Sequence, residues 1–177
     1  RAIGEFARRH DLIIVSDEIH HDLVYPGQKH TVFPLADDSV SERLIVMSAT
    51  TKTFNIAGSH VGNVIIPDST LRATFKKRMA ALGMSPNYFG LMMAAAAYSP
   101  EGAAWVDDLM AYLDENRQLF DAAINALPGI KSTPLEATYL AWVDFSGTGM
   151  SPDEVKRRVQ QEAQVAANHG ETFGQGG

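Results

Sequence analysis

The spacing of apolar positions changes along the chain, and the changes predict an alternation of helices and strands. Residues 12–16 (LIIVS) and 44–47 (LIVM) are short apolar runs, typical of strands that are buried on both faces of a parallel sheet. A helix is predicted before the first run, over residues 1–9, and a third strand over residues 61–66. This order indicates an α/β fold.

The rest of the chain is predicted to be mainly helical. Asp68-Ser69 is a suitable N-cap for a helix over residues 70–82, and Gly83 is suited to end it. An Ala- and Met-rich helix with little polar surface, expected to be buried, is predicted over residues 87–98. A long helix over residues 102–127 has apolar positions that recur near the 3.6-residue period.

The last part of the chain returns to mixed structure. Residues 139–145 are predicted to form a strand. Ser151 then opens a capping box, with Pro152 at the first helical position and Glu154 at the third, so a further helix is expected there.

Composition restricts the class of protein. The 177 residues are 45% hydrophobic and 20% charged, which is typical of a soluble globular protein. The net charge of −6 argues against a nucleic-acid partner. Without cysteine the chain has no disulfide and no thiolate metal site, which fits a cytoplasmic protein. No uninterrupted apolar run reaches the roughly 18 residues of a membrane span.

Two charged residues follow the two apolar strands. Asp17 ends the first strand and Lys52 lies shortly after the second, so both are expected at the ligand-binding edge of the sheet. Small hydroxylated residues precede Lys52 and a turn ending at Gly58 follows it, as suits a lysine that forms a Schiff base. The pair suggests pyridoxal 5'-phosphate (PLP), with Asp17 at the pyridine nitrogen and Lys52 at the aldehyde carbon.

Three stretches carry a family resemblance: residues 15–20 (VSDEIH), 51–58 (TKTFNIAG) and 137–144 (ATYLAWVD). They resemble the fold-type-I PLP enzymes of the class I/II aminotransferase superfamily. The likeness is strongest to the MalY/PatB-like branch, whose members are largely cystathionine β-lyases and related C–S lyases. It runs along essentially the whole chain.

The resemblance implies a three-layer α/β fold of the aspartate aminotransferase type. Residues 1–112 would form part of the large PLP-binding domain, and residues 113–177 part of the small α+β C-terminal domain. Relative to the family the chain is expected to be a fragment. The loop that cradles the PLP phosphate and the arginine that clamps the substrate carboxylate would lie outside it.

The resemblance also implies the site residues. Lys52 would be the catalytic residue, and Asp17, His20, Thr51 and Lys52 itself would bind the cofactor. His20 stands where many aminotransferases have a tyrosine that bonds the phenolic oxygen of PLP. A histidine at this position resembles the pattern of the MalY/PatB-like branch.

The sequence departs from the general aminotransferase pattern on the phosphate side. Ala49 stands where that pattern has serine or glycine, and His60 stands where it has a phosphate-binding arginine. The hydroxyls of Ser48, Thr50 and Thr51 are alternative phosphate donors, and Thr51 is the best placed by the family pattern. His60 is either a further donor or a packing residue.

The histidines near Asp17 do not predict a metal site. His20, His21 and His30 have no partner at a spacing typical of zinc ligands, so no metal is expected. His21 is interpreted as structural or as part of the rim of the site.

The implied activity is that of a C–S β-lyase acting on cystathionine or another S-substituted cysteine, in a homodimer. Two alternatives stay open. The first is a class I/II aminotransferase, which shares the Lys52 chemistry. The second is a non-catalytic ligand-sensing domain of the same fold, joined to a DNA-binding domain.

Overall fold

The computed structural model describes residues 1–175, which divide into two compact units. The first unit contains residues 1–114 together with residues 136–139, and the second contains residues 115–135 and the chain from residue 140. The predicted division into domains after residue 112 stays a prediction. Residues 176–177 of the predicted second domain lie outside the described residues.

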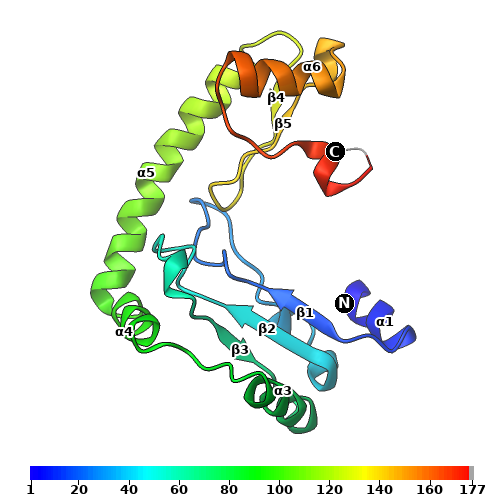
Figure 1. The fold of residues 1–177 in the computed structure, drawn as a ribbon, viewed down its shortest axis with the longest axis vertical. Coiled ribbons are helices and arrows are strands. Elements are labelled where there is room, and N and C mark those ends of the chain that lie inside the picture. The colour runs from blue at the N-terminus through cyan, green and yellow to red at the C-terminus, as the bar shows by residue number, and fades with distance from the viewer. Residues whose placement is uncertain (176–177) are drawn as a thin grey trace. The chain divides into compact units, whose positions relative to one another are not determined.

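The first unit is built on a three-stranded sheet with the order β1-β2-β3 (Figure 1). These strands are β1 (Ile14–Asp17), β2 (Leu44–Ser48) and β3 (Asn63–Ile65). β1 runs parallel to β2, whereas β3 pairs with β2 in the antiparallel direction. The predicted strands are therefore confirmed, with shorter bounds at both ends of the third.

The register of the parallel pair determines which residues leave the sheet together. Ile14 lies opposite Leu44, and Asp17 lies opposite Met47. The Glu18 amide donates to the Met47 carbonyl at 2.8 Å, one residue beyond β1. The two carboxyl ends thus meet at one edge of the sheet.

Helices account for most of the remaining structure of both units. The α-helices are α1 (Ala2–Arg9), α2 (Phe33–Ala36), α3 (Ser69–Ala81), α4 (Tyr88–Ala97), α5 (Pro100–Asn125) and α6 (Pro152–Lys156). Shorter helical segments lie at Asp38–Arg43, Ala57–Ser59, Ser146–Thr148, Arg157–Glu162 and Gly170–Phe173. In the second unit, β4 (Lys131–Ser132) and β5 (Val143–Asp144) form an antiparallel pair. Within the described residues, no helix combines the length and the apolar character needed to span a membrane.

The helix boundaries follow the side chains that cap them. Asp68 Oδ1 accepts from the amide of Leu71 at 2.7 Å at the start of α3, and Ser151 Oγ accepts from the amide of Glu154 at 3.3 Å at the start of α6. Both predicted caps are confirmed. The N-cap of α4 is Asn87.

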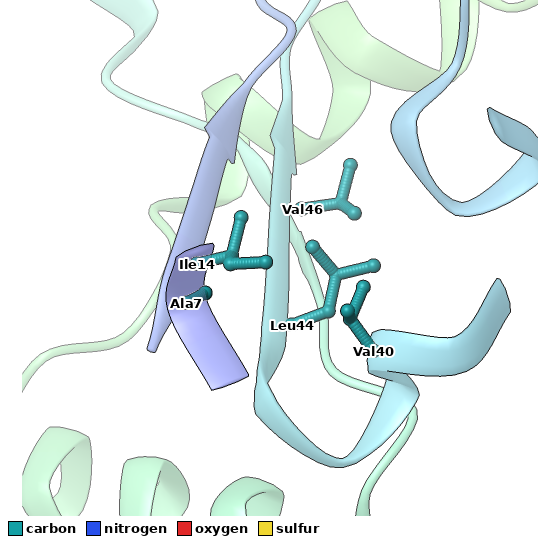
Figure 2. Packing of buried hydrophobic residues seen from close by; sticks show 5 residues of the cluster. All are labelled: Ala7, Ile14, Val40, Leu44 and Val46. Carbon is teal, nitrogen blue, oxygen red and sulfur yellow. The ribbon is translucent and has the colours of Figure 1, made fainter. Parts of the chain in front are cut away.

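A small apolar cluster holds the first unit together. It joins α1, the two parallel strands and the segment between them, as Figure 2 shows. Its buried members are Ala7, Ile14, Val40, Leu44 and Val46. Phe33 of α2 packs against this cluster, so the loop between the strands is tied to the core.

The expectation that the first strand is buried on both faces is wrong for the described chain. Ile14 is 8% exposed, but its neighbour Val15 is 55% exposed. Successive side chains of a strand point to opposite faces. Only the face that carries Ile14 is therefore covered, and Asp17 shares the open face with Val15.

The helix predicted over residues 87–98 was expected to be buried, and this is also wrong. Its aromatic and methionine side chains are exposed, and Gly90 is its buried residue. A Cβ atom at Gly90 would lie 2.6 Å from the Ser59 carbonyl oxygen, so α4 packs closely against the chain at this position. The apolar composition of a helix indicates that it tends to be buried. It does not indicate which surface would cover the helix.

The strand predicted over residues 139–145 is mostly irregular. Only β5, Val143–Asp144, is extended and paired. Thr138 has a positive φ of 60° just before the predicted strand, and its amide donates to the Leu23 carbonyl at 2.6 Å. That turn redirects the chain before an extended run can begin.

Because Leu44 is 1% exposed and lies in the apolar cluster, we expect Leu44→Ala in the full-length protein to lower the free energy of unfolding by about 2–5 kcal/mol. Urea denaturation followed by circular dichroism measures this loss. Leu82→Ala is the matched control, since Leu82 is 57% exposed and its truncation should cost less than about 1 kcal/mol. Equal losses for the two variants would contradict the assignment of the core.

Candidate active site

The parallel strands deliver Asp17 and Lys52 to the same edge of the sheet. Asp17 is the last residue of β1, and its Oδ1 accepts from the amide of Ile19 at 3.3 Å. Lys52 lies four residues after the end of β2 in a tight turn, and it is half-buried.

The turn around Lys52 is closed by its own backbone. The Phe54 amide donates to the Thr50 carbonyl and the Ile56 amide to the Thr51 carbonyl, both at 3.0 Å. Asn55 adopts a positive φ of 53°, which asparagine tolerates better than most residues. Asn55 thus helps to form the predicted turn after Lys52.

His20 is held from a distant part of the sequence. Its Nδ1 lies 2.8 Å from Thr138 Oγ1, and its ring centroid lies 5.7 Å from that of Tyr139. Residues 136–139 reach this position through an isolated bridge between Val24 and Ala137. The third predicted motif thus supplies the support of a residue in the first.

The charges of Lys52 and Asp17 both act on the His20 ring. Burial lowers the pKa of His20 below its ordinary value of 6.5, and the positive charge of Lys52 lowers it further, while the Asp17 carboxylate opposes them. His20 is therefore neutral near pH 7. The electrostatic coupling places these three predicted site residues in one neighbourhood.

A cavity of about 270 Å³ lies in the neighbourhood of Asp17 and His20. Asp17 and His20 line it, together with Lys29, His30 and Thr138. Lys52 and Thr51 are not among its lining residues. The structure thus brings Asp17 and His20 to the cavity wall.

Two buried hydroxyls near Lys52 have no hydrogen-bond partner within the described part of the chain. Thr50 is 1% exposed and lies two residues before Lys52, and Ser59 lies at the end of the segment that follows the turn. A hydroxyl without a partner can donate to a phosphate oxygen. His60 is exposed and adopts a left-handed conformation at the end of Ala57–Ser59.

Glu18 is a site-proximal residue whose role the sequence did not reveal. Its carboxylate is buried and accepts from Ser16 Oγ at 2.9 Å, His30 Nε2 at 2.8 Å and the Phe33 amide at 3.0 Å. Burial raises the pKa of the Glu18 carboxyl, but these hydrogen bonds outweigh it, so the pKa lies below its ordinary value of 4.5. The ionised carboxylate ties the loop after Asp17 to the start of α2.

Thr138 is a second residue that sequence reasoning did not single out. Its side chain meets His20, which lies 118 positions away. A positive φ is unusual for a β-branched residue, and such strain is concentrated at functional sites. Residue type alone gives no signal of either property.

Comparison with known proteins agrees with this geometry. The family model for aminotransferase classes I and II matches residues 1–176. The chain belongs to this family.

The chain is similar to cystathionine β-lyase PatB from Bacillus subtilis, with 37% identity over 99% of the chain and 46% of the relative. It is 27% identical to an aspartate aminotransferase from Pyrococcus abyssi, over 99% of the chain and 44% of the relative. Cystalysin from Treponema denticola, solved with a pyridoxal 5'-phosphate cofactor, superimposes with a TM-score of 0.90 at 34% identity. That superposition covers 99% of the chain and 45% of cystalysin.

These relatives confirm the predicted fold class and the likeness to the MalY/PatB-like branch. The chain spans about half the length of the curated relatives that it matches. It therefore holds part of the class I/II aminotransferase fold. The roles assigned to Lys52, Asp17, His20 and Thr51 stay predictions.

The lowered pKa of Glu18 makes its contribution to stability depend on pH. A carboxyl whose pKa is lower in the folded than in the unfolded state stabilises above its unfolded pKa of about 4.5, and this is lost as the pH falls through the folded value. At pH 7 we expect Glu18→Gln to lower the free energy of unfolding by about 1–3 kcal/mol. The difference in free energy of unfolding from the unsubstituted protein should shrink as the pH falls below about 4.5.

Urea denaturation of both proteins across this pH range tests the Glu18 prediction. The matched control is Glu5→Gln on the exposed surface of α1, which should follow the unsubstituted protein throughout. A Glu18→Gln difference that stays constant with pH would refute the proposed ionised carboxylate.

Proposed function

We propose that the protein is a PLP-dependent C–S β-lyase that acts on cystathionine or another S-substituted cysteine by β-elimination. The observation that carries the proposal is the common action of Lys52 and Asp17 on the His20 ring, because a PLP site needs these groups together. The likeness to cystathionine β-lyase PatB supports the substrate class.

The residues present fit the cofactor. Lys52 would hold its aldehyde carbon, Asp17 its pyridine nitrogen and His20 its phenolic oxygen, while Thr51 would bind its phosphate. The buried, unpartnered hydroxyl of Thr50 adds a donor of the kind that a phosphate oxygen requires. When bound, PLP supplies an electron sink that stabilises negative charge on the substrate Cα.

In the proposed reaction, Lys52 is the general base. An amine in its neutral form can accept the Cα proton of the substrate. The Cβ–S bond then breaks and the thiolate leaves with the bonding electron pair. With one water molecule the net products are a thiol, pyruvate and ammonia.

Asp17 and His20 prepare the site for this proton transfer. The Asp17 carboxylate would accept a hydrogen bond from the pyridine nitrogen of PLP and would keep that nitrogen protonated. His20 is neutral because burial and Lys52 lower its pKa, so its ring offers one donor and one acceptor. The Thr138 hydroxyl is the hydrogen-bond partner of Nδ1, so Nε2 would be the nitrogen that meets the phenolic oxygen of PLP.

An aminotransferase of class I/II is the alternative function, since the aspartate aminotransferase of Pyrococcus abyssi is also a relative. It would use the same four residues up to the removal of the Cα proton. We further propose a homodimer located in the cytoplasm, with residues 1–112 in a large domain and residues 113–177 in a small one.

We expect Lys52→Ala in the full-length protein to abolish the visible absorption band that added PLP produces. Thiol release should also fall by about 100-fold or more, because a general base is lost. Lys76→Ala, on the exposed surface of α3, is the matched control and should retain both. A band and an activity that survive Lys52→Ala would remove Lys52 from the proposed role.

The two candidate functions differ in their products. Incubation with cystathionine but no keto acid should release pyruvate and ammonia in equal amounts if the protein is a β-lyase. Lactate dehydrogenase coupled to NADH oxidation measures the pyruvate. Amino transfer that requires a keto acid, without pyruvate release, would instead assign the aminotransferase.

A further inference from the structure

A side-chain bridge joins the turn that carries Lys52 to the turn that carries His20. Thr53 directly follows Lys52, and its side chain is 1% exposed. Its Oγ1 donates to Asp22 Oδ2 at 2.9 Å. Asp22 lies two residues after His20, so one hydrogen bond spans the two turns.

The second carboxylate oxygen of Asp22 is also held. Asp22 Oδ1 lies 3.1 Å from Nε2 of His21, whose Nδ1 lies 2.6 Å from the Glu18 carbonyl oxygen. Each ring nitrogen of His21 thus lies next to an oxygen that can accept a hydrogen bond. Asp22 is thereby fixed to its own turn as well as to Thr53.

The bridge continues the coupling of the two strands beyond the sheet. Backbone pairing ends where the Glu18 amide meets the Met47 carbonyl, and the two chains then separate into turns. The bond between Thr53 and Asp22 links those turns again, one residue from Lys52. A link at the residue next to Lys52 restricts the backbone from which the Lys52 amine extends.

We propose that Asp22 is a positioning residue of the active site, which acts through Thr53 to hold the Lys52 amine in place. The inference rests on the proposed function, because the amine must meet both the cofactor and the substrate. Asp22 is not assigned a contact with either of them. His21, which was predicted to be structural, supports Asp22 from the other side.

Reactivity of the Lys52 amine tests the proposal in the cofactor-free, full-length protein. Acetic anhydride labels amines, and mass spectrometry gives the labelling rate of Lys52 separately from that of Lys76 in α3. Thr53→Val removes the bridging hydroxyl without changing the size of the side chain. We expect it to change the Lys52 rate severalfold and to leave the Lys76 rate unaltered.

The loaded enzyme gives a second readout. Thr53→Val and Asp22→Ala should each lower kcat by about 10- to 100-fold with a much smaller change in KM, because misplacing a reacting group by about 1 Å can cost 100-fold. Each should also shift the pH midpoint of the visible PLP band. The double variant should be no worse than either single one, since both remove the same link.

Conservative and matched variants complete the design. Thr53→Ser keeps the hydroxyl and should restore the labelling rate, kcat and band midpoint, while Asp22→Asn keeps an acceptor and should be milder than Asp22→Ala. Asp11→Asn changes a carboxylate that is exposed at the surface and should have no effect. Circular dichroism confirms that each variant is folded.

The outcomes separate this inference from the proposed function. Unaltered Lys52 labelling and kcat in Thr53→Val, or losses that add in the double variant, would overturn the role of Asp22. A purely structural bridge would lower the melting temperature alone. Absence of any PLP band in the unsubstituted protein would instead reject the proposed function, and the labelling rates would still decide whether Asp22 positions Lys52.

Discussion

The parallel pairing of β1 with β2 is the constraint on which the candidate site depends. The register places Asp17 opposite Met47, and the apolar cluster fixes that register because Ile14 and Leu44 must both face the core. A slip of one residue would turn every side chain of β1 to the other face. Core burial and the position of Asp17 are thus set by the same interaction.

Hydrogen bonds from polar side chains hold the loop that follows β1. A buried carboxylate is costly unless donors satisfy it, and Glu18 has three of them, from Ser16, His30 and the Phe33 amide. These bonds attach the loop after β1 to α2, whose Phe33 side chain packs on the apolar cluster. The loop that carries His20 is therefore held at both ends.

Features that depend on local sequence could be predicted. The apolar runs gave the two parallel strands, and the cap at Asp68 marked the start of α3, because each involves neighbours along the chain. Asp17 and Lys52 could be assigned to one edge because strand ends in a parallel sheet coincide. The family resemblance added His20 and Thr51, which spacing alone did not single out.

Features that depend on distant contacts could not be predicted. The support of His20 by Thr138 joins residues 118 positions apart and requires an unusual backbone conformation. The exposure of α4 and of Val15 likewise depends on which surface meets them, and hydrophobicity alone does not specify that surface. The bridge between Asp22 and Thr53 joins two turns whose residues are 31 positions apart.

The two candidate reactions begin with the same event, the transfer of the Cα proton to the Lys52 amine. They diverge afterwards. In a lyase the Cβ–S bond breaks, whereas in an aminotransferase the proton would be given to the cofactor and the amino group would stay on the cofactor. Residues that place Lys52, such as Asp22 and Thr53, therefore serve both reactions alike. Groups that orient the Cβ substituent must decide between them, so the products, rather than the geometry around Lys52, distinguish a lyase from an aminotransferase.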